Sequence, residues 1–230
     1  MLVEGHQARI AASLMCADFA KLDRQLDELV EAGIRRLHLD FADGAFVPSL
    51  LLGTEIFSLL AGHAEFDLES HLMIRDPARF AAYFAERSDL VIVHIEATAN
   101  VVECIDQIRG AGARPGLAVS PDTPIERLAP LLSLVDQVLI MTVQPGFAGA
   151  PFIPAMVEKV RWIGERVAAT GMHLEIEVDG GINPETIPAL ASAGASTFVG
   201  GSSGLFVGGD LGAAAGGMLA AAQPGRSRRR

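Results

Sequence analysis

The sequence is poor in the features that mark secreted and membrane proteins. Of its 230 residues only two are cysteines, Cys16 and Cys104, which is too few for a disulfide framework. The segment Met1–Arg9 carries polar or charged side chains at positions 4, 6 and 7, where a secretory signal peptide would be apolar. No stretch reaches the ~18 consecutive apolar residues that a transmembrane helix requires. We therefore expect a cytoplasmic protein with no membrane partner.

Positive charge is also scarce, since 18 lysines and arginines face 28 aspartates and glutamates and give a formal net charge of −10. A surface of this sign repels a phosphate backbone, so nucleic acid is not an expected partner. The basic run at residues 223–230 has nothing apolar to pack, and we expect it to form a disordered tail. The remainder, residues 1–222, is long enough for one domain with a full core.

Apolar side chains make up 50% of the residues, and short β-branched runs alternate with longer alanine-rich amphipathic segments. This alternation is typical of repeated βα units with a parallel sheet. The predicted strands are Arg9–Met15, Arg36–Phe41, Asp67–Met73, Leu90–Ile95, Gly116–Val119, Gln137–Val143, Leu174–Val178 and Thr197–Gly200. The predicted helices are Leu22–Ala32, Thr54–Leu60, Pro77–Ala85, Val101–Ala111, Pro124–Leu132, Pro154–Ala169, Pro184–Ala193 and Leu211–Ala221.

These repeated units favour a single closed (β/α)8 barrel, the TIM-barrel fold, over an open doubly wound sheet. An open sheet more often has about five or six strands and a glycine-rich turn after the first strand. Here the segment Ser13–Cys16 stands at that turn and contains no glycine. A dinucleotide site is therefore not expected.

Four side chains are candidates for the active site, which in such a barrel lies at the C-terminal ends of the strands. His38 and Asp40 end the second predicted strand, and the period of two points both to the barrel interior while their leucine neighbours point toward the helices. His71 lies near the end of the third strand, and Asp179 follows the seventh. Taken singly, a strand histidine is more often a satisfied core residue, and a strand-end aspartate more often caps a helix.

Together, two imidazoles and two carboxylates would be costly to bury unpaired, and a divalent cation that binds all four removes that cost. Two carboxylates on opposite sides of a cation suit removal of a proton from one face of a carbon and its return to the other face. The cation would hold the oxygens of the substrate while charge develops as an enediolate. The pattern thus predicts epimerisation, with Asp40 and Asp179 as the acid/base groups.

Glycine turns follow the last three predicted strands, at Gly146–Gly149, Gly180–Gly181 and Gly201–Ser202. Barrels of this class often bind phosphate at the loops after strands seven and eight, through backbone N–H groups and a helix N-terminus. The structural alternative, in which the glycines only permit tight turns, stays open.

Ordered motifs extend along nearly the whole chain. They are Ala12-Ser13-Leu14-Met15-Cys16-Ala17-Asp18-Phe19, Leu37-His38-Leu39-Asp40-Phe41-Ala42-Asp43-Gly44, Phe46-Val47-Pro48, His71-Leu72-Met73, Met141-Thr142-Val143-Gln144-Pro145-Gly146-Phe147, Glu177-Val178-Asp179-Gly180-Gly181-Ile182-Asn183-Pro184-Glu185-Thr186 and Gly201-Ser202. These motifs resemble those of the ribulose-phosphate 3-epimerases and their sister group, the allulose-6-phosphate 3-epimerases.

The resemblance implies a barrel of the ribulose-phosphate-binding type, a homo-oligomer and a phosphorylated ketose as substrate. It implies one divalent metal ion per subunit, usually zinc, with iron, manganese or cobalt as alternatives. The implied metal ligands are His38, Asp40, His71 and Asp179, and the two aspartates would exchange protons with the substrate. The implied substrate-binding residues are Ser13, His71, Met73, Met141, Gly146, Phe147, Ala148, Gly149, Gly180, Gly181, Gly201 and Ser202.

Three positions depart from the family pattern, which usually has Met at Ala42, Asn or Asp at Gln144, and Gln at Ala150. The first change removes a polarizable thioether and leaves space near the reacting carbon. We therefore predict that these positions affect the choice of substrate more than the type of reaction, and that Ala42 helps to set that choice.

The first expected substrate is D-ribulose 5-phosphate, converted to D-xylulose 5-phosphate. The alternative is the interconversion of D-allulose 6-phosphate and D-fructose 6-phosphate, which the segments 13–16 and 202–206 favour. A barrel that decarboxylates or cleaves its substrate would commonly use a lysine beside the strand-end carboxylates, but Lys21 lies at the start of a predicted helix and Lys159 within one. A non-catalytic phosphate-binding barrel is a further alternative, because fold alone does not establish function.

Overall fold

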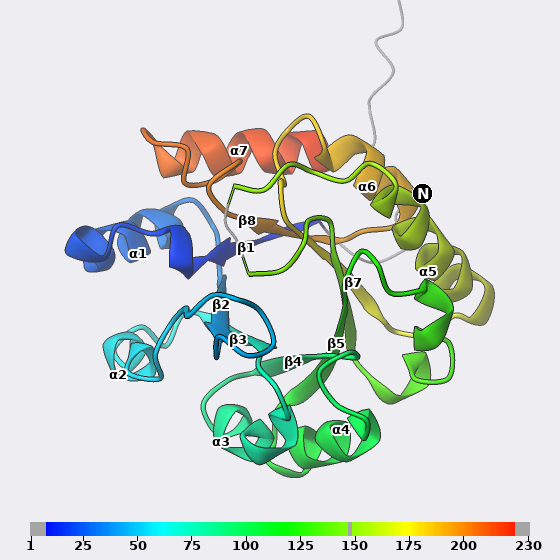
Figure 1. Cartoon of the computed structure of the whole chain (residues 1–230). Helices are drawn as coiled ribbons and strands as arrows, with labels where there is room; N and C mark the ends of the chain where they lie inside the picture. Colours follow the sequence, from blue (N-terminus) through cyan, green and yellow to red (C-terminus); the bar gives the residue numbers. More distant parts are fainter. Residues whose placement is uncertain (1–7, 147–148, 224–230) are drawn as a thin grey trace, which may run out of the picture.

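The computed structural model describes residues 8–146 and 149–223. Its strands form one closed barrel in which all neighbours pair in parallel, including β8 with β1 (Figure 1). The strands are β1 (Arg9–Ser13), β2 (Arg36–Ala42), β3 (Asp67–Met73), β4 (Leu90–His94), β5 (Arg114–Val119), β6 (Gln137–Met141), β7 (Glu175–Asp179) and β8 (Thr197–Gly200). The predicted (β/α)8 barrel is confirmed, although β1, β4 and β6 end earlier than predicted.

Helices cover the outside of the barrel (Figure 1). They are α1 (Leu22–Glu31), α2 (Ile56–Leu60), α3 (Ala81–Ala85), α4 (Val101–Gly110), α5 (Met156–Thr170), α6 (Ile187–Ala193) and α7 (Leu211–Ala222). The shorter 3₁₀ turns are η1 (Leu14–Cys16), η2 (Phe19–Lys21), η3 (Pro77–Arg79), η4 (Ile125–Leu128) and η5 (Leu132–Leu134). Each predicted strand is thus followed by helical structure, as βα units require.

Two predicted helices differ from the structure. The predicted helix at 124–132 is wrong, because the chain there forms only the turns η4 and η5. Pro130 lies between these turns; it has no N–H to donate, and its ring would clash with a carbonyl one turn earlier in a continuous α-helix. The predicted helix at 77–85 is divided at Phe80, whose φ of −123° separates η3 from α3.

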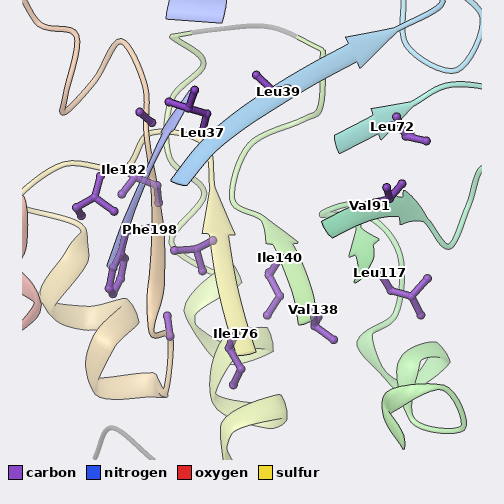
Figure 2. Packing of buried hydrophobic residues seen from close by; sticks show 14 of the residues in the cluster. Leu37, Leu39, Leu72, Val91, Leu117, Val138, Ile140, Ile176, Ile182 and Phe198 are labelled. Atoms are coloured by element: carbon purple, nitrogen blue, oxygen red, sulfur yellow. The ribbon is translucent and has the colours of Figure 1, made fainter. Parts of the chain in front are cut away.

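The apolar core lies between the barrel and its helices. Leu37 and Leu39 of β2 are fully buried in this cluster, as are Leu72 and Val91 on the next two strands (Figure 2). Burial of a leucine side chain contributes roughly 1.5–3 kcal/mol relative to exposure. The outward leucines alternate with the inward His38 along the same strand, so the packing that stabilises the barrel also fixes which side chains face its interior.

The barrel interior holds both apolar and polar side chains. A small apolar cluster consists of Leu90, Ile92, Ala118, Leu139 and Met141. Toward the N-terminal ends of the strands lies a buried polar layer, here called the barrel floor, which consists of Arg36, Glu69, Gln137, Glu175 and Glu177. Toward the C-terminal ends lies the barrel mouth, which carries the candidate site.

Candidate metal centre and active site

The barrel mouth brings together His38 and Asp40 from β2, His71 from β3 and Asp179 from β7. One ligand atom of each side chain lies within 4.8 Å of all the others. Nδ1 of His71 is 3.1 Å from Oδ1 of Asp40 and 3.2 Å from Nε2 of His38. Donors that stand far apart in the sequence therefore converge on one point inside the barrel.

The two carboxylates have opposite electrostatic surroundings. Burial opposes ionisation of Asp40, but the charge of His38 and hydrogen bonds from His38 and His71 outweigh it and lower the pKa of Asp40. Burial, followed by repulsion from Asp40, raises the pKa of Asp179 to about 6. A carboxylic acid with a pKa near neutrality can both release and accept a proton at physiological pH.

The donor set fits a divalent cation. Two imidazole nitrogens and two carboxylates are ligands that zinc, iron, manganese and cobalt all accept. A cation bound between Asp40 and Asp179 would compensate the repulsion that raises the pKa of Asp179. The mouth is therefore compatible with a divalent metal ion, and the donor types do not select one element.

A cavity opens at the mouth and reaches both carboxylates. Ser13 lines it and donates a hydrogen bond from Oγ to Oδ2 of Asp40, at 3.1 Å. Met73 and Met141 also line it. His38 and His71 are fully buried. The cavity thus exposes the two proposed proton-transfer groups, while the imidazoles lie out of contact with solvent.

The predicted phosphate end of the cavity is formed by glycine turns. Its lining includes Gly146, Gly149, Gly180, Gly181, Gly201 and Ser202. Gly180 has a φ of +110°, and a Cβ there would lie 2.3 Å from a methyl group of Val143, so the turn after β7 requires glycine. Phe147 and Ala148, which were also predicted to bind substrate, lie outside the described residues, as do residues 224–230 of the predicted tail.

Several residues of the site were missed from the sequence. Met15, Cys16 and Leu51 line the cavity beside the predicted residues. His94, at the end of β4, is fully buried and has its Nε2 atom 2.9 Å from Nε2 of His71. Burial and the charge of His71 lower the pKa of His94 to about 4, against the opposing effect of Glu96.

A usable signal existed for His94. The alternation that places His38 and Asp40 inside the barrel also points Leu90, Ile92 and His94 to one face of β4. The cavity residues Met15 and Leu51 have no such signal, because they lie on loops or turns whose path the strand pattern does not specify.

Comparison with known proteins identifies the relatives of this chain. The model of the ribulose-phosphate 3 epimerase family matches residues 9–206. The chain belongs to this family. It is accordingly an epimerase, a member of the isomerase class of enzymes.

Similar proteins of the family come from distant organisms. The ribulose-phosphate 3-epimerase, cytoplasmic isoform, of Oryza sativa subsp. japonica is 41% identical over 201 residues, which cover 85% of this chain and 86% of the relative. The ribulose-phosphate 3-epimerase of Mycobacterium leprae is 41% identical over 195 residues, covering 84% and 86%. That of Methanocaldococcus jannaschii is 38% identical over 195 residues, covering 85% and 83%.

Solved structures with low sequence identity share the barrel. The 3-hexulose-6-phosphate synthase of Salmonella typhimurium has a TM-score of 0.68 at 15% identity and covers 93% of this chain and 98% of its own. KGPDC of Streptococcus mutans has a TM-score of 0.67 at 15% identity and covers 94% and 97%. These likenesses support the fold.

Among the described residues of this chain, no helix has the length and apolar character needed to cross a membrane.

Proposed function

We propose that this chain interconverts D-ribulose 5-phosphate and D-xylulose 5-phosphate by epimerisation at C3. The observation that carries the proposal is that Asp40 and Asp179 line the same cavity from β2 and β7, strands that are separated by β1 and β8 around the barrel. One carboxylate removes the C3 proton from one face of the sugar, and the other returns a proton to the opposite face. The names of the family relatives support this substrate.

The proposed metal ligands are His38, Asp40, His71 and Asp179, with zinc as the first candidate and iron, manganese or cobalt as alternatives. A bound divalent cation would stabilise the negative charge that develops on the substrate oxygens when C3 loses its proton. The hydroxyl of Ser13 holds one oxygen of Asp40, which limits the rotation of that carboxylate.

The remaining cavity residues hold the substrate in this proposal. Met73 and Met141 form an apolar wall that excludes water from the reacting carbon. The segments 146–149, which includes Phe147 and Ala148, and 180–181 would bind the phosphate through backbone N–H groups. Gly201 and the hydroxyl of Ser202 would complete this phosphate site. This binding mode agrees with a cavity lining that contains no lysine or arginine among the described residues.

A decarboxylating or cleaving barrel is not favoured. Lys159 lies on α5, and its Nζ donates to the carbonyls of Ser120 and Pro121, at 3.2 and 2.6 Å, and to that of Thr123. Lys21 is 64% exposed and pairs with Asp18 on the surface. Neither lysine lines the cavity, so neither is placed to act as a proton donor or a Schiff-base amine.

The choice between ketose phosphates depends on the wall near Ala42. Ala42 ends β2, and its carbonyl accepts a hydrogen bond from the N–H of Leu51 at 3.5 Å. Leu51 lines the cavity. We propose that Leu51 supplies apolar bulk that the missing methionine would otherwise provide. A longer sugar would need part of the same space.

The test is to compare kcat/KM for D-ribulose 5-phosphate and D-allulose 6-phosphate with the same metal-loaded protein. We expect faster turnover of the pentose phosphate, and Ala42→Met should change the preference by about 10- to 200-fold if position 42 contacts the sugar. A preference for the hexose phosphate would transfer the assignment to the allulose branch. Absence of turnover of both sugars by a folded, metal-loaded protein would contradict the proposed reaction.

Family membership also supports a homo-oligomer, and the cytoplasmic isoform among the relatives supports a cytoplasmic location. Light scattering on the purified protein measures the first, and fractionation of the source cells tests the second.

A further inference from the structure

His71 has two ring nitrogens, and each faces a different environment. Nδ1 faces Asp40 and His38 in the barrel mouth. Nε2 lies 2.9 Å from Nε2 of His94, with the two rings stacked at a centroid distance of 5.0 Å. Both side chains are fully buried, so no water replaces this contact. One of the two Nε2 atoms must donate a proton, and the other must accept it.

The other nitrogen of His94 decides the direction of that hydrogen bond. Nδ1 of His94 lies 3.1 Å from Oε2 of Glu96 and 3.4 Å from Oγ of Ser120. Glu96 also accepts a hydrogen bond at Oε1 from the N–H of Ser120, at 2.9 Å. Burial raises the pKa of Glu96, but hydrogen bonds from His94, Thr123 and Ser120 outweigh it and lower that pKa to about 2.

An ionised carboxylate can only accept, so Nδ1 of His94 carries the proton that lies between His94 and Glu96. In a neutral His94 the Nε2 atom then has a free lone pair and accepts from Nε2–H of His71. His71 then keeps its proton on Nε2, so a cation that displaces the Nδ1 proton shared with Asp40 meets the Nδ1 lone pair in the mouth. The series of hydrogen bonds from Glu96 through His94 to His71 therefore specifies the tautomer of His71 that carries a proton on Nε2.

We propose that His94 and Glu96 are positioning residues that hold His71 in the tautomer and ring orientation needed to bind a divalent cation through Nδ1. The inference rests on the proposed metal centre and extends it to residues outside the donor set. Nδ1 of the second imidazole, His38, lies 2.5 Å from Oε1 of Glu69. The second ring nitrogen of each histidine donor thus has a buried partner. For His38 this partner is the carboxylate of Glu69, and for His71 it is His94, which in turn contacts Glu96. Outer partners of this kind typically change metal affinity by about 10- to 100-fold when removed.

A purely structural role would give a different result from a positioning role. His94→Leu removes the acceptor for Nε2–H of His71 and keeps an apolar side chain. His94→Gln keeps an acceptor, because its amide oxygen can receive that proton. If His94 only packs, the zinc affinity of each variant should follow its stability. If His94 positions His71, the glutamine variant should recover much of the zinc affinity that the leucine variant loses.

The experiment measures the zinc dissociation constant of the full chain by competition with a chelating indicator, alongside ¹⁵N NMR of labelled histidines and thermal unfolding. We expect His94→Leu to weaken zinc binding by about 10- to 100-fold and His94→Gln to recover most of that loss. The ¹⁵N shifts of His71 should report a protonated Nε2 in the metal-free wild type and a partly unprotonated Nε2 in His94→Leu. Glu165→Gln removes one exposed surface carboxylate and serves as the control, with unchanged affinity.

The outcomes separate this inference from the proposed function. A wild-type protein that binds no divalent metal overturns the proposed metal centre, and the inference with it. A wild type that binds zinc, together with a folded His94→Leu variant of equal affinity and unchanged His71 shifts, overturns the positioning role alone. Equal losses in the leucine and glutamine variants also overturn it.

A second variant covers the case in which His94→Leu fails to fold. Glu96→Gln replaces the ionised acceptor with a weaker neutral one and keeps nearly the same shape. We expect it to reduce zinc affinity to a smaller extent than the loss of His94. Unchanged zinc affinity in a folded Glu96→Gln protein contradicts the proposal.

Discussion

The barrel floor and the barrel mouth are both lined by buried charged side chains, but they balance their charge in different ways. In the floor, Nη1 of Arg36 lies 2.6 Å from Oε1 of Glu175 and 3.5 Å from Oε2 of Glu69. Gln137 donates a hydrogen bond to Glu69 at 3.0 Å. In the mouth, Asp40 and Asp179 face a cavity whose described lining includes no lysine or arginine.

The difference separates a structural cluster from a functional one. Burial opposes the charge of Arg36, but the charges of Glu69, Glu175 and Glu177 outweigh it and raise the pKa of Arg36. The floor therefore contains its own cation. In the mouth the charge of His38 lowers the pKa of Asp40, but Asp179 keeps a pKa of about 6 beside a negative partner in Asp40. A site with this imbalance is suited to a cation supplied from solution.

The largest expected effect is the loss of catalysis in the mouth. Asp40→Asn and Asp179→Asn each remove one of the two groups that transfer protons, and each should reduce net epimerisation by about 10²- to 10⁴-fold. Steady-state kinetics with D-ribulose 5-phosphate measures the loss, and circular dichroism checks the fold. Turnover close to the wild-type rate in either variant would show that its carboxylate is not an acid/base group.

The next effect is a loss of stability from the floor. Arg36→Met leaves the carboxylates of Glu69 and Glu175 without their buried cation and should lower the free energy of unfolding by about 3–5 kcal/mol. Urea titration measures this change. Arg24→Met is the matched control, because Arg24 is 77% exposed and its pair with Glu28 should contribute at most about 1 kcal/mol. Equal losses in both variants would remove the distinction between the buried and surface pairs.

A third effect distinguishes the two regions by their response to metal. Added zinc at roughly 100 times its dissociation constant should stabilise the wild type by about 2.7 kcal/mol. The resulting rise in melting temperature should disappear in His71→Ala, which lacks a proposed ligand, and persist in the floor variant Glu175→Gln. Thermal scans with zinc and with a chelator measure it. A rise that survives in His71→Ala would place the metal elsewhere.

The smallest effect concerns pH and Glu96. The pKa of Glu96 falls from 4.5 to about 2 on folding, so its ionised form stabilises the folded protein above pH 4.5 and this contribution is lost as pH falls toward 2. In metal-free protein, the difference in unfolding free energy between wild type and Glu96→Gln should shrink as pH falls through this range. Urea titrations at several pH values test this. A constant difference would mean that Glu96 is not held ionised by its neighbours.

The sequence was sufficient to bring the four candidate metal ligands together, because period-two alternation is a local property. It placed His38 and Asp40 on the inner face of β2, and the parallel strand order then brought His71 and Asp179 to the same end of the barrel. The same rule applies to His94, which was overlooked.

The floor could not be predicted in this way. Arg36 and Glu175 are 139 residues apart, and no local pattern indicates that these two side chains meet. The helix predicted at 124–132 failed for a different reason, since apolar spacing favoured a helix while Pro130 prevented its continuation. Local periodicity therefore predicts the direction of a side chain, whereas its partner depends on the closed barrel.

Proton transfer at C3 of a ketose phosphate by the two carboxylates of the mouth can be observed directly. The measurement is hydrogen exchange at that carbon, followed by ¹H NMR of D-ribulose 5-phosphate in D₂O with zinc-loaded protein. We expect solvent deuterium to enter C3 as D-xylulose 5-phosphate forms, and formation of xylulose 5-phosphate to fall by about 10²- to 10⁴-fold in Asp40→Asn. A folded, fully zinc-loaded protein that leaves the C3 hydrogen in place and forms no xylulose 5-phosphate would contradict the proposed mechanism.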